Sequence, residues 1–109
     1  MVVHTNRWPW GISRIIVLDK GNALCKLTID DADNTEAWLC DVVVISKMRR
    51  RGLGRALLQE AIKQAKEMGA KTMKLETLTG SWMVGWYKRN GFEFVENSQD
   101  GNPIFKKIL

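Results

Sequence analysis

Histidine and cysteine are scarce in this chain of 109 residues, which has one histidine, His4, and two cysteines, Cys25 and Cys40. A structural zinc site takes about four Cys or His ligands, commonly with a CxxC pair, and the chain has no such pair. We therefore expect no metal site and no Cys–His catalytic pair. Because each cysteine is flanked by apolar residues, two free thiols in a core are favoured over a disulfide.

Long apolar runs are also missing. No stretch approaches the roughly 20 apolar residues that span a bilayer, and the N-terminus lacks the apolar centre of a signal peptide. The expectation is therefore no membrane-spanning segment and a cytoplasmic location. The chain is 45% hydrophobic and 27% charged, a composition typical of a globular protein, and its length suits one domain over residues 1–109.

Acidic residues are absent from one strongly basic window. Residues 47–55 contain no Asp or Glu but five basic residues: Lys47, Arg49, Arg50, Arg51 and Arg55. These five account for the whole net charge of +5, since the remaining 12 basic residues are balanced by 12 acidic ones. A positive charge gathered at one place favours a compact polyanion as the ligand. A nucleic-acid-binding protein more often spreads Lys and Arg over a face or along a helix, so nucleic acid is not the expected partner.

Hydrophobic periodicity predicts the order of the elements. β-Branched and alternating stretches predict strands over residues 13–19, 23–29, 36–45, 72–78, 92–95 and 104–109. Apolar positions three and four apart predict an amphipathic helix from Leu53 to Met68 that ends at Gly69, and a short helix is expected at Ser81–Arg89. The strand–helix–strand unit should form a parallel pair with a right-handed crossover. The expected fold class is therefore α/β (α+β), with a mixed, mostly antiparallel sheet and helices on its faces.

The segment Arg49-Arg50-Arg51-Gly52-Leu53-Gly54-Arg55 stands between an apolar strand and the first predicted helix. Glycines let backbone N–H groups approach an anion, the first N–H groups of a helix lack partners, and the helix dipole adds positive charge at the same point. The pattern therefore predicts a phosphate-binding turn. An ordinary tight turn is the alternative interpretation of Gly52 and Gly54.

These motifs resemble those of the GNAT superfamily of N-acetyltransferases. Its acetyl-CoA loop has Arg or Gln, two variable positions, Gly, one variable position and Gly or Ala, and here it stands as Arg49-x-x-Gly52-x-Gly54. The run from Tyr87 to Gly91-Phe92 is similar to a pattern near the C-terminus of that family, and Leu39–Val44 looks like the strand before the loop. The resemblance covers residues 13–109 and implies acetyl-CoA as the acetyl donor, with no metal.

The resemblance also implies what this chain lacks. A typical member begins with a strand and one or two helices that help to cover the acceptor site, whereas this chain is expected to start directly at the hairpin of residues 13–29. Most of the usual N-terminal strand and helices would then be absent. The acceptor side would be open, or completed by a large substrate or by a second subunit in a homodimer, against which Trp8 and Trp10 could be buried.

Cofactor contacts follow from the same resemblance. The backbone of Val44, Ile45 and Ser46 is expected to pair with the pantetheine arm and to polarise the thioester carbonyl. The N–H groups from Arg50 through Arg55 would hold the pyrophosphate, and Arg89 would reach the 3′-phosphate unless it is a solvated cation at a helix end. The expected cofactor-binding residues are Val44, Ile45, Ser46, Arg49, Arg50, Arg51, Gly52, Leu53, Gly54, Arg55, Tyr87 and Arg89.

Acetyl transfer also needs an acid and a base. Tyr87, the only tyrosine, is the candidate general acid for the coenzyme thiolate, and a hydrogen-bonded structural tyrosine is the alternative. Asp41 is a charged residue in an otherwise apolar strand, which makes it the candidate base, with Glu36 as a weaker one. Trp82 and Trp86, four apart, would line an acceptor wall or pack in the core.

The leading hypothesis is an N-acetyltransferase that uses acetyl-CoA and acts by direct attack of a primary amine in a ternary complex, with no covalent enzyme intermediate. The expected acceptor is an amine of a small molecule or of a protein. Two alternatives stay open: a CoA-binding regulatory module with little catalysis, and a small basic nucleic-acid-binding domain. A nucleoside-triphosphate loop is excluded because the turn lacks the Gly-Lys-Ser/Thr ending that such loops need.

Overall fold

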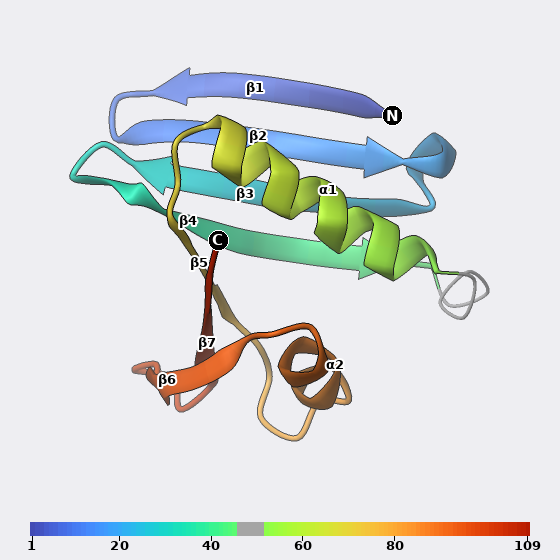
Figure 1. Ribbon diagram of the computed structural model, residues 1–109, viewed down its shortest axis with the longest axis vertical. Coiled ribbons are helices and arrows are strands. Elements are labelled where there is room, and N and C mark those ends of the chain that lie inside the picture. Colours follow the sequence, from blue (N-terminus) through green and yellow to red (C-terminus); the bar gives the residue numbers. More distant parts are fainter. Residues whose placement is uncertain (46–51) are drawn as a thin grey trace.

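The computed structural model describes residues 1–45 and 52–109. In this part of the chain a seven-stranded sheet is accompanied by two α-helices and one short 3-10 helix, as Figure 1 shows. In chain order the elements are β1 (Val2–Trp8), β2 (Gly11–Leu18), η1 (Asp19–Gly21), β3 (Ala23–Asp30), β4 (Asp33–Val44), α1 (Leu53–Glu67), β5 (Thr72–Glu76), α2 (Met83–Arg89), β6 (Glu93–Asn97) and β7 (Pro103–Ile108). The predicted fold class is confirmed.

The sheet has the strand order β1-β2-β3-β4-β5-β7-β6. Strands β1 to β4 are joined as successive antiparallel hairpins, and β5, β7 and β6 are also antiparallel to one another. Only β4 and β5 are parallel among the described strands, and α1 is the crossover between them, as predicted. Figure 1 shows that β5 and β7 run across the direction of β1–β4.

The first strand differs from the prediction, which started the fold at residue 13. Strand β1 pairs with β2 along its whole length, from Val2 opposite Val17 to Trp8 opposite Gly11. Only Pro9 and Trp10 connect the two strands, so no helix is inserted between them. Strand β1 was not predicted because all but one of its residues are exposed, and an exposed edge strand has no apolar periodicity.

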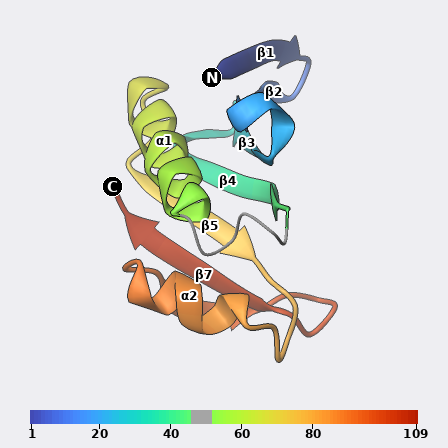
Figure 2. The ribbon, with the colours of Figure 1, turned by 90° about the vertical axis from the view of Figure 1, so that its right-hand side faces the viewer.

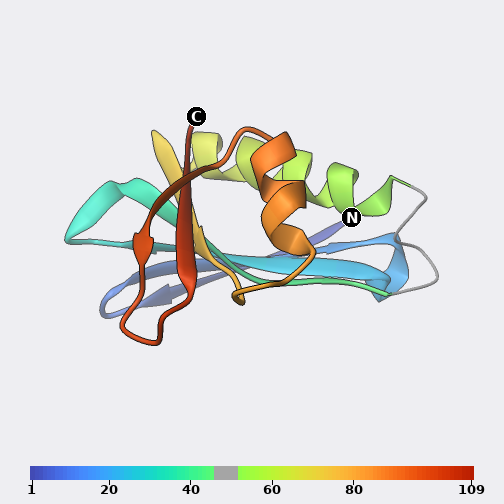
Figure 3. The same ribbon diagram turned by 90° about the horizontal axis from the view of Figure 1, so that it is seen from below.

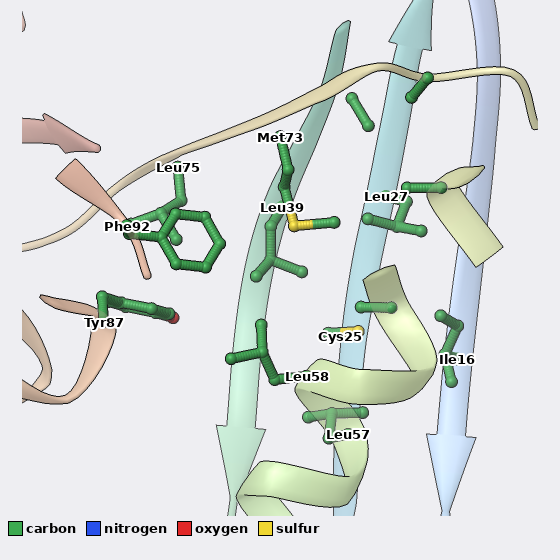
Figure 4. Close-up of a cluster of buried hydrophobic side chains, with 14 of the residues drawn as sticks. Ile16, Cys25, Leu27, Leu39, Leu57, Leu58, Met73, Leu75, Tyr87 and Phe92 are labelled. Atoms are coloured by element: carbon green, nitrogen blue, oxygen red, sulfur yellow. The ribbon is translucent and has the colours of Figure 1, made fainter. Parts of the chain in front are cut away.

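The core lies between α1 and strands β2 to β4. Alternate residues of β3 are buried, as predicted, and Cys25 and Leu27 contact the buried face of α1 (Figure 4). Leu57 and Leu58 are the large side chains that α1 contributes, and its alanines allow the helix to approach the sheet closely. Both cysteines are free thiols, as predicted.

Helix α1 ends close to where the sequence predicted. The N–H groups of Gly69 and Ala70 donate to the carbonyl oxygens of Lys66 and Ala65, both at 3.0 Å. This pattern of two closing hydrogen bonds is the Schellman arrangement of helix C-termini. Neither described helix is long and apolar enough to cross a membrane.

Both helices lie on the same side of strands β1 to β4, as Figure 3 shows. Helix α1 covers β2 to β4, whereas α2 lies near the β5–β7 end of the sheet (Figure 2). The opposite side of β1–β4 is covered by no described helix. With no helix between β1 and β2, no described helix covers that face of these strands (Figure 3).

Gly11 should be intolerant of a side chain. It is buried at the start of β2, where an added Cβ would overlap the carbonyl oxygen of Ile29 on β3, a backbone atom that cannot turn aside. We expect Gly11→Ala to lower the free energy of unfolding by about 1–3 kcal/mol, measured by urea denaturation. Gly54→Ala is the control, because a Cβ there would stand 3.6 Å from the Trp86 ring, an ordinary contact. Equal stability of the two variants would contradict this account.

Candidate active site

The parallel strands β4 and β5 separate after a short stretch of pairing. They pair from Glu36 opposite Thr72 to Leu39 opposite Leu75, and not beyond. A cavity of about 440 Å³ opens where they diverge. Its lining comes from the ends of both strands, from α2 and the turn before it, and from the turn before β7: Leu39, Cys40, Asp41, Val42, Leu75, Glu76, Thr77, Leu78, Ser81, Met83, Tyr87 and Asn102. We call this the strand-end cavity.

A β-bulge reorients β4 at this cavity. Leu24 faces Val43 and Lys26 faces Cys40, so Cys25 alone stands opposite two residues, Asp41 and Val42. Asp41 has a φ of +53°, a left-handed conformation that aspartate tolerates better than most residues. The extra residue shifts the alternation, and Val42 and Val44 pack against the core beyond it while Val43 is 49% exposed.

Tyr87 brings the predicted acid to the strand-end cavity. Its side chain is 3% exposed and points from α2 toward β4, beside Leu39 and Leu58 (Figure 4). Its ring contacts Trp86 and Phe92 edge to face, at centroid distances of 5.1 and 5.6 Å. Burial, and to a lesser degree the nearby Cys25 thiol, raises the pKa of Tyr87 to about 12. The hydroxyl is therefore protonated at neutral pH and able to donate a proton or a hydrogen bond.

Two carboxylates line the same cavity, and no Lys or Arg is among its described lining residues. Asp41 is exposed at the bulge of β4, and Glu76 ends β5. Glu76 accepts hydrogen bonds from Ser98 Oγ at 3.1 Å and from Asn102 Nδ2 at 3.5 Å, which hold its side chain in place. Glu76 was missed in the sequence, where its position at the end of a predicted parallel strand was the available signal.

A second cavity, of about 590 Å³, lies on the other side of Val42. Its lining includes the end of β4 and the beginnings of both helices: Val42, Val43, Val44, Gly52, Gly54, Arg55, Trp82, Met83 and Trp86. We call this the helix-end cavity. It joins two of the segments that the sequence linked to cofactor binding, the end of β4 with Val44 and the start of α1 with Gly52, Gly54 and Arg55.

The N-terminus of α1 opens into the helix-end cavity. Gly52 has a φ of +77° and accepts the first helical hydrogen bond, from the N–H of Ala56 at 3.0 Å. The N–H groups of Leu53, Gly54 and Arg55 precede that bond, so they have no acceptor within the helix. No acidic residue stands in this first turn, and Arg55 lines the cavity. The arrangement suits an anion.

Trp82 and Trp86 were expected to form an acceptor wall or part of the core. Trp86 packs against the core, as one of these alternatives predicted, and both residues also line the helix-end cavity. The Trp86 ring lies 3.6 Å from the position of a Cβ on Gly54, so it touches the start of α1. Trp82 is 58% exposed at the mouth of the cavity.

Four further predicted cofactor-binding residues, Ser46, Arg49, Arg50 and Arg51, lie outside the described residues.

Three predicted contacts are not brought to either cavity. The N–H of Ile45 donates to the carbonyl oxygen of Asn22 at 3.0 Å and is therefore already used. Arg89 is exposed near the C-terminal end of α2 and lines neither cavity. Glu36, the weaker candidate base, lies before the divergence of the strands and pairs with Lys74 at 3.6 Å.

The two cavities share Val42 and Met83 as a common wall. On one side of this wall are helix N–H groups and Arg55, and on the other side are Tyr87, Asp41 and Glu76. A phosphorylated molecule in the helix-end cavity would thus lie next to a cationic molecule in the strand-end cavity. The arrangement fits transfer of a group between two ligands.

The sequence matches the model of the acetyltransferase (GNAT) family over residues 7–92, and the chain belongs to this family. It is therefore an acetyltransferase of the group that uses acetyl-CoA. No curated protein matches the sequence.

Solved structures show the same fold. An N-acetyltransferase from Thermoplasma acidophilum in complex with coenzyme A is 22% identical, with a TM-score of 0.73 over 89% of this chain and 60% of that one. The ribosomal-protein-S18-alanine N-acetyltransferase from Escherichia coli is 22% identical, with a TM-score of 0.69 over 94% of this chain and 71% of that one. An acetyltransferase from Bacillus cereus is 20% identical, with a TM-score of 0.71 over 98% and 74%. This chain thus spans about 60 to 74% of the length of these proteins.

The two glycines at the start of α1 should differ in their tolerance of alanine. A side chain at Gly52 would be strained by its φ of +77°, whereas a Cβ at Gly54 meets only ordinary contacts. We expect Gly52→Ala to weaken coenzyme A binding about tenfold and Gly54→Ala to leave it nearly unchanged, measured by isothermal titration calorimetry. Equal losses in both variants would mean that the conformation of Gly52 does not shape the site.

Proposed function

We propose that this protein is an N-acetyltransferase that moves the acetyl group of acetyl-CoA to a primary amine by direct attack in a ternary complex. The observation that carries the proposal is the wall of Val42 and Met83, which separates a cavity suited to an anion from one lined by carboxylates. A donor and an acceptor of opposite charge would each have its own side. Their reacting atoms would meet at that wall.

The helix-end cavity is the proposed donor site. The N–H groups of Leu53, Gly54 and Arg55 would bind the pyrophosphate of coenzyme A, and the Arg55 guanidinium would add positive charge. Among the described strands, β4 pairs with β5 only as far as Leu39, and the β4 backbone past the bulge would pair with the pantetheine arm. Trp82 and Trp86 would cover the apolar part of the arm.

The strand-end cavity is the proposed acceptor site. The Asp41 and Glu76 carboxylates would attract an ammonium group and hold it by charge-assisted hydrogen bonds. An amine must lose a proton before it attacks, and Asp41 would accept that proton directly or through a water molecule. Because Pro9 and Trp10 alone connect β1 to β2, no helix inserted between these strands narrows the acceptor side. Both a small amine and an amine of a protein therefore fit the proposal.

Tyr87 would act as the general acid. Acetyl-CoA supplies a thioester whose carbonyl carbon is attacked by the amine nitrogen, with breakage of the carbon–sulfur bond. The Tyr87 hydroxyl would give its proton to the departing thiolate and regain one from solvent. Burial, which raises the pKa of Tyr87 to about 12, keeps the phenol protonated at neutral pH, so a proton is present for transfer.

Removing the hydroxyl of Tyr87 should slow turnover and spare binding. We expect Tyr87→Phe to lower kcat by roughly 10² to 10⁴, with KM for acetyl-CoA little changed, in an assay of thiol release. Since the pKa of Tyr87 is raised to about 12, ionisation of the hydroxyl should not lower the wild-type kcat below about pH 10. A Tyr87→Phe enzyme as fast as the wild type would exclude Tyr87 as the acid.

A wild-type protein without acetyltransferase activity would argue against the proposed function itself. If it binds coenzyme A but releases no thiol with any amine in a panel of diamines, amino acids and peptides, the CoA-binding regulatory module would be favoured.

The Asp41 and Glu76 carboxylates should affect binding of the amine and not binding of acetyl-CoA. We expect Glu76→Gln and Asp41→Asn each to raise KM for a cationic amine about tenfold while KM for acetyl-CoA stays constant. Asparagine also tolerates the left-handed conformation of position 41, so that variant should keep the bulge. Glu96→Gln on the exposed strand β6 is the matched control, since Glu96 lines neither cavity. Unchanged KM values in both variants would place the acceptor elsewhere.

A further inference from the structure

We propose that the outer edge of β1 binds the β1 strand of a second copy of this chain, so that two sheets join into one across a twofold axis. The proposal is independent of the proposed function, because β1 contributes no residue to either cavity. It rests on the shape of this edge, on the side chains that a twofold axis would bring together, and on the open face next to it.

Strand β1 is a long and regular edge. All seven of its residues, Val2–Trp8, pair with β2 without a shift in register. It stands at one end of the sheet, so its outer N–H and C=O groups meet no described strand (Figure 1). It contains no proline, no lysine and no bulge, which are the usual features that prevent an edge strand from pairing with another chain.

The opposite edge of the same sheet is protected. Strand β6 has five residues, two of them glutamates, Glu93 and Glu96. Its pairing with β7 is interrupted by a shift in register between Phe94 and Glu96. Strand β6 is therefore short, irregular and carries two like charges, whereas β1 has seven residues, an unshifted register and one charged residue, Arg7, whose charge is paired with Asp31. Only one edge of the sheet is built to accept a strand.

The side chains of β1 complement their own copies. In the antiparallel register centred on Thr5, which pairs all seven residues, Val2 faces Trp8 of the second copy, and Val3 faces its Arg7. His4 faces Asn6, and Thr5 faces Thr5. No two like charges are opposed, and a β-branched residue stands opposite an aromatic one at each end, which is a favourable cross-strand pair. The Arg7 guanidinium donates to both carboxylate oxygens of Asp31, at 2.9 and 2.6 Å, so its charge is already paired within the chain when Arg7 faces Val3 of the second copy.

Pairing would also cover exposed apolar side chains. Val2 pairs with Val17, whose neighbour Ile16 points to the core under α1, so Val2 lies on the opposite face of the sheet. Trp8 is on the same face as Val2 and donates a hydrogen bond to Ser13 there, and the side chains of Val2 and Trp8 are 51% and 45% exposed. On this face Val2 is followed across the sheet by Val17, Leu24 and Val43. A second β1 would extend this apolar row and bring a tryptophan against Val2 at each end of the joint.

The test uses introduced charge at His4 and Asn6, which are exposed and face each other across the proposed axis. We expect the wild type to sediment at twice the mass of one chain and His4→Lys/Asn6→Lys to sediment at the mass of one chain, because lysine would oppose lysine twice. An equimolar mixture of that variant with His4→Glu/Asn6→Glu should return to the doubled mass. Val95→Lys on β6 is the control and should remain a dimer.

Each other result overturns the proposal. A monomeric wild type at high protein concentration would leave the β1 edge to some other chain or to none. A dimeric His4→Lys/Asn6→Lys variant would place the interface elsewhere, and a mixture that stays monomeric would exclude the twofold register. Circular dichroism and thermal melting of each variant verify that the monomer is folded, so that loss of the dimer is not loss of the fold.

Discussion

The short pairing of β4 with β5 is the constraint on which the site depends. Two parallel strands that remained paired to their ends would have closed the sheet and left no space between them. Here the pairing stops at Leu39 and Leu75, and the bulge at Asp41 then turns the following valines toward the core. The gap receives Tyr87 from α2, and the released edge of β4 faces the N-terminus of α1. Both cavities thus arise from one interruption of hydrogen bonding.

The two cavities also differ in charge. The backbone at the start of α1 carries positive partial charge and Arg55 adds a full one, whereas the strand ends beyond Val42 carry Asp41 and Glu76. A wall made of uncharged Val42 and Met83 keeps these two surroundings apart. In the proposed mechanism this separation would let an anionic donor and a cationic acceptor bind at the same time, each with its reacting group at the wall.

Much of the fold could be predicted because local chemistry specifies it. The alternation of β3, the apolar stripe of α1 and the glycine after it identified these elements, and the crossover rule then made β4 and β5 parallel. Strand β1 could not be predicted, since its stability comes from pairing with β2 and not from a buried face. Trp82 and Trp86 were expected in an acceptor wall or in the core; Trp86 does pack against the core, but only the tertiary structure shows that both also line the cavity at the start of α1.

The sequence by itself determined the family motifs, the position of the basic glycine turn and the identity of the candidate acid, because each of these is a short segment whose chemistry is complete in its own residues. Only the tertiary structure decided what lies beside them. Glu76 is 35 positions from Asp41 in the chain, and both reach one cavity because β4 and β5 are parallel and end at the same edge of the sheet. The hydrogen bond from the Ile45 N–H and the bulge at Asp41 likewise depend on β3 and the turn before it. Neither could be predicted from the residues of β4 alone.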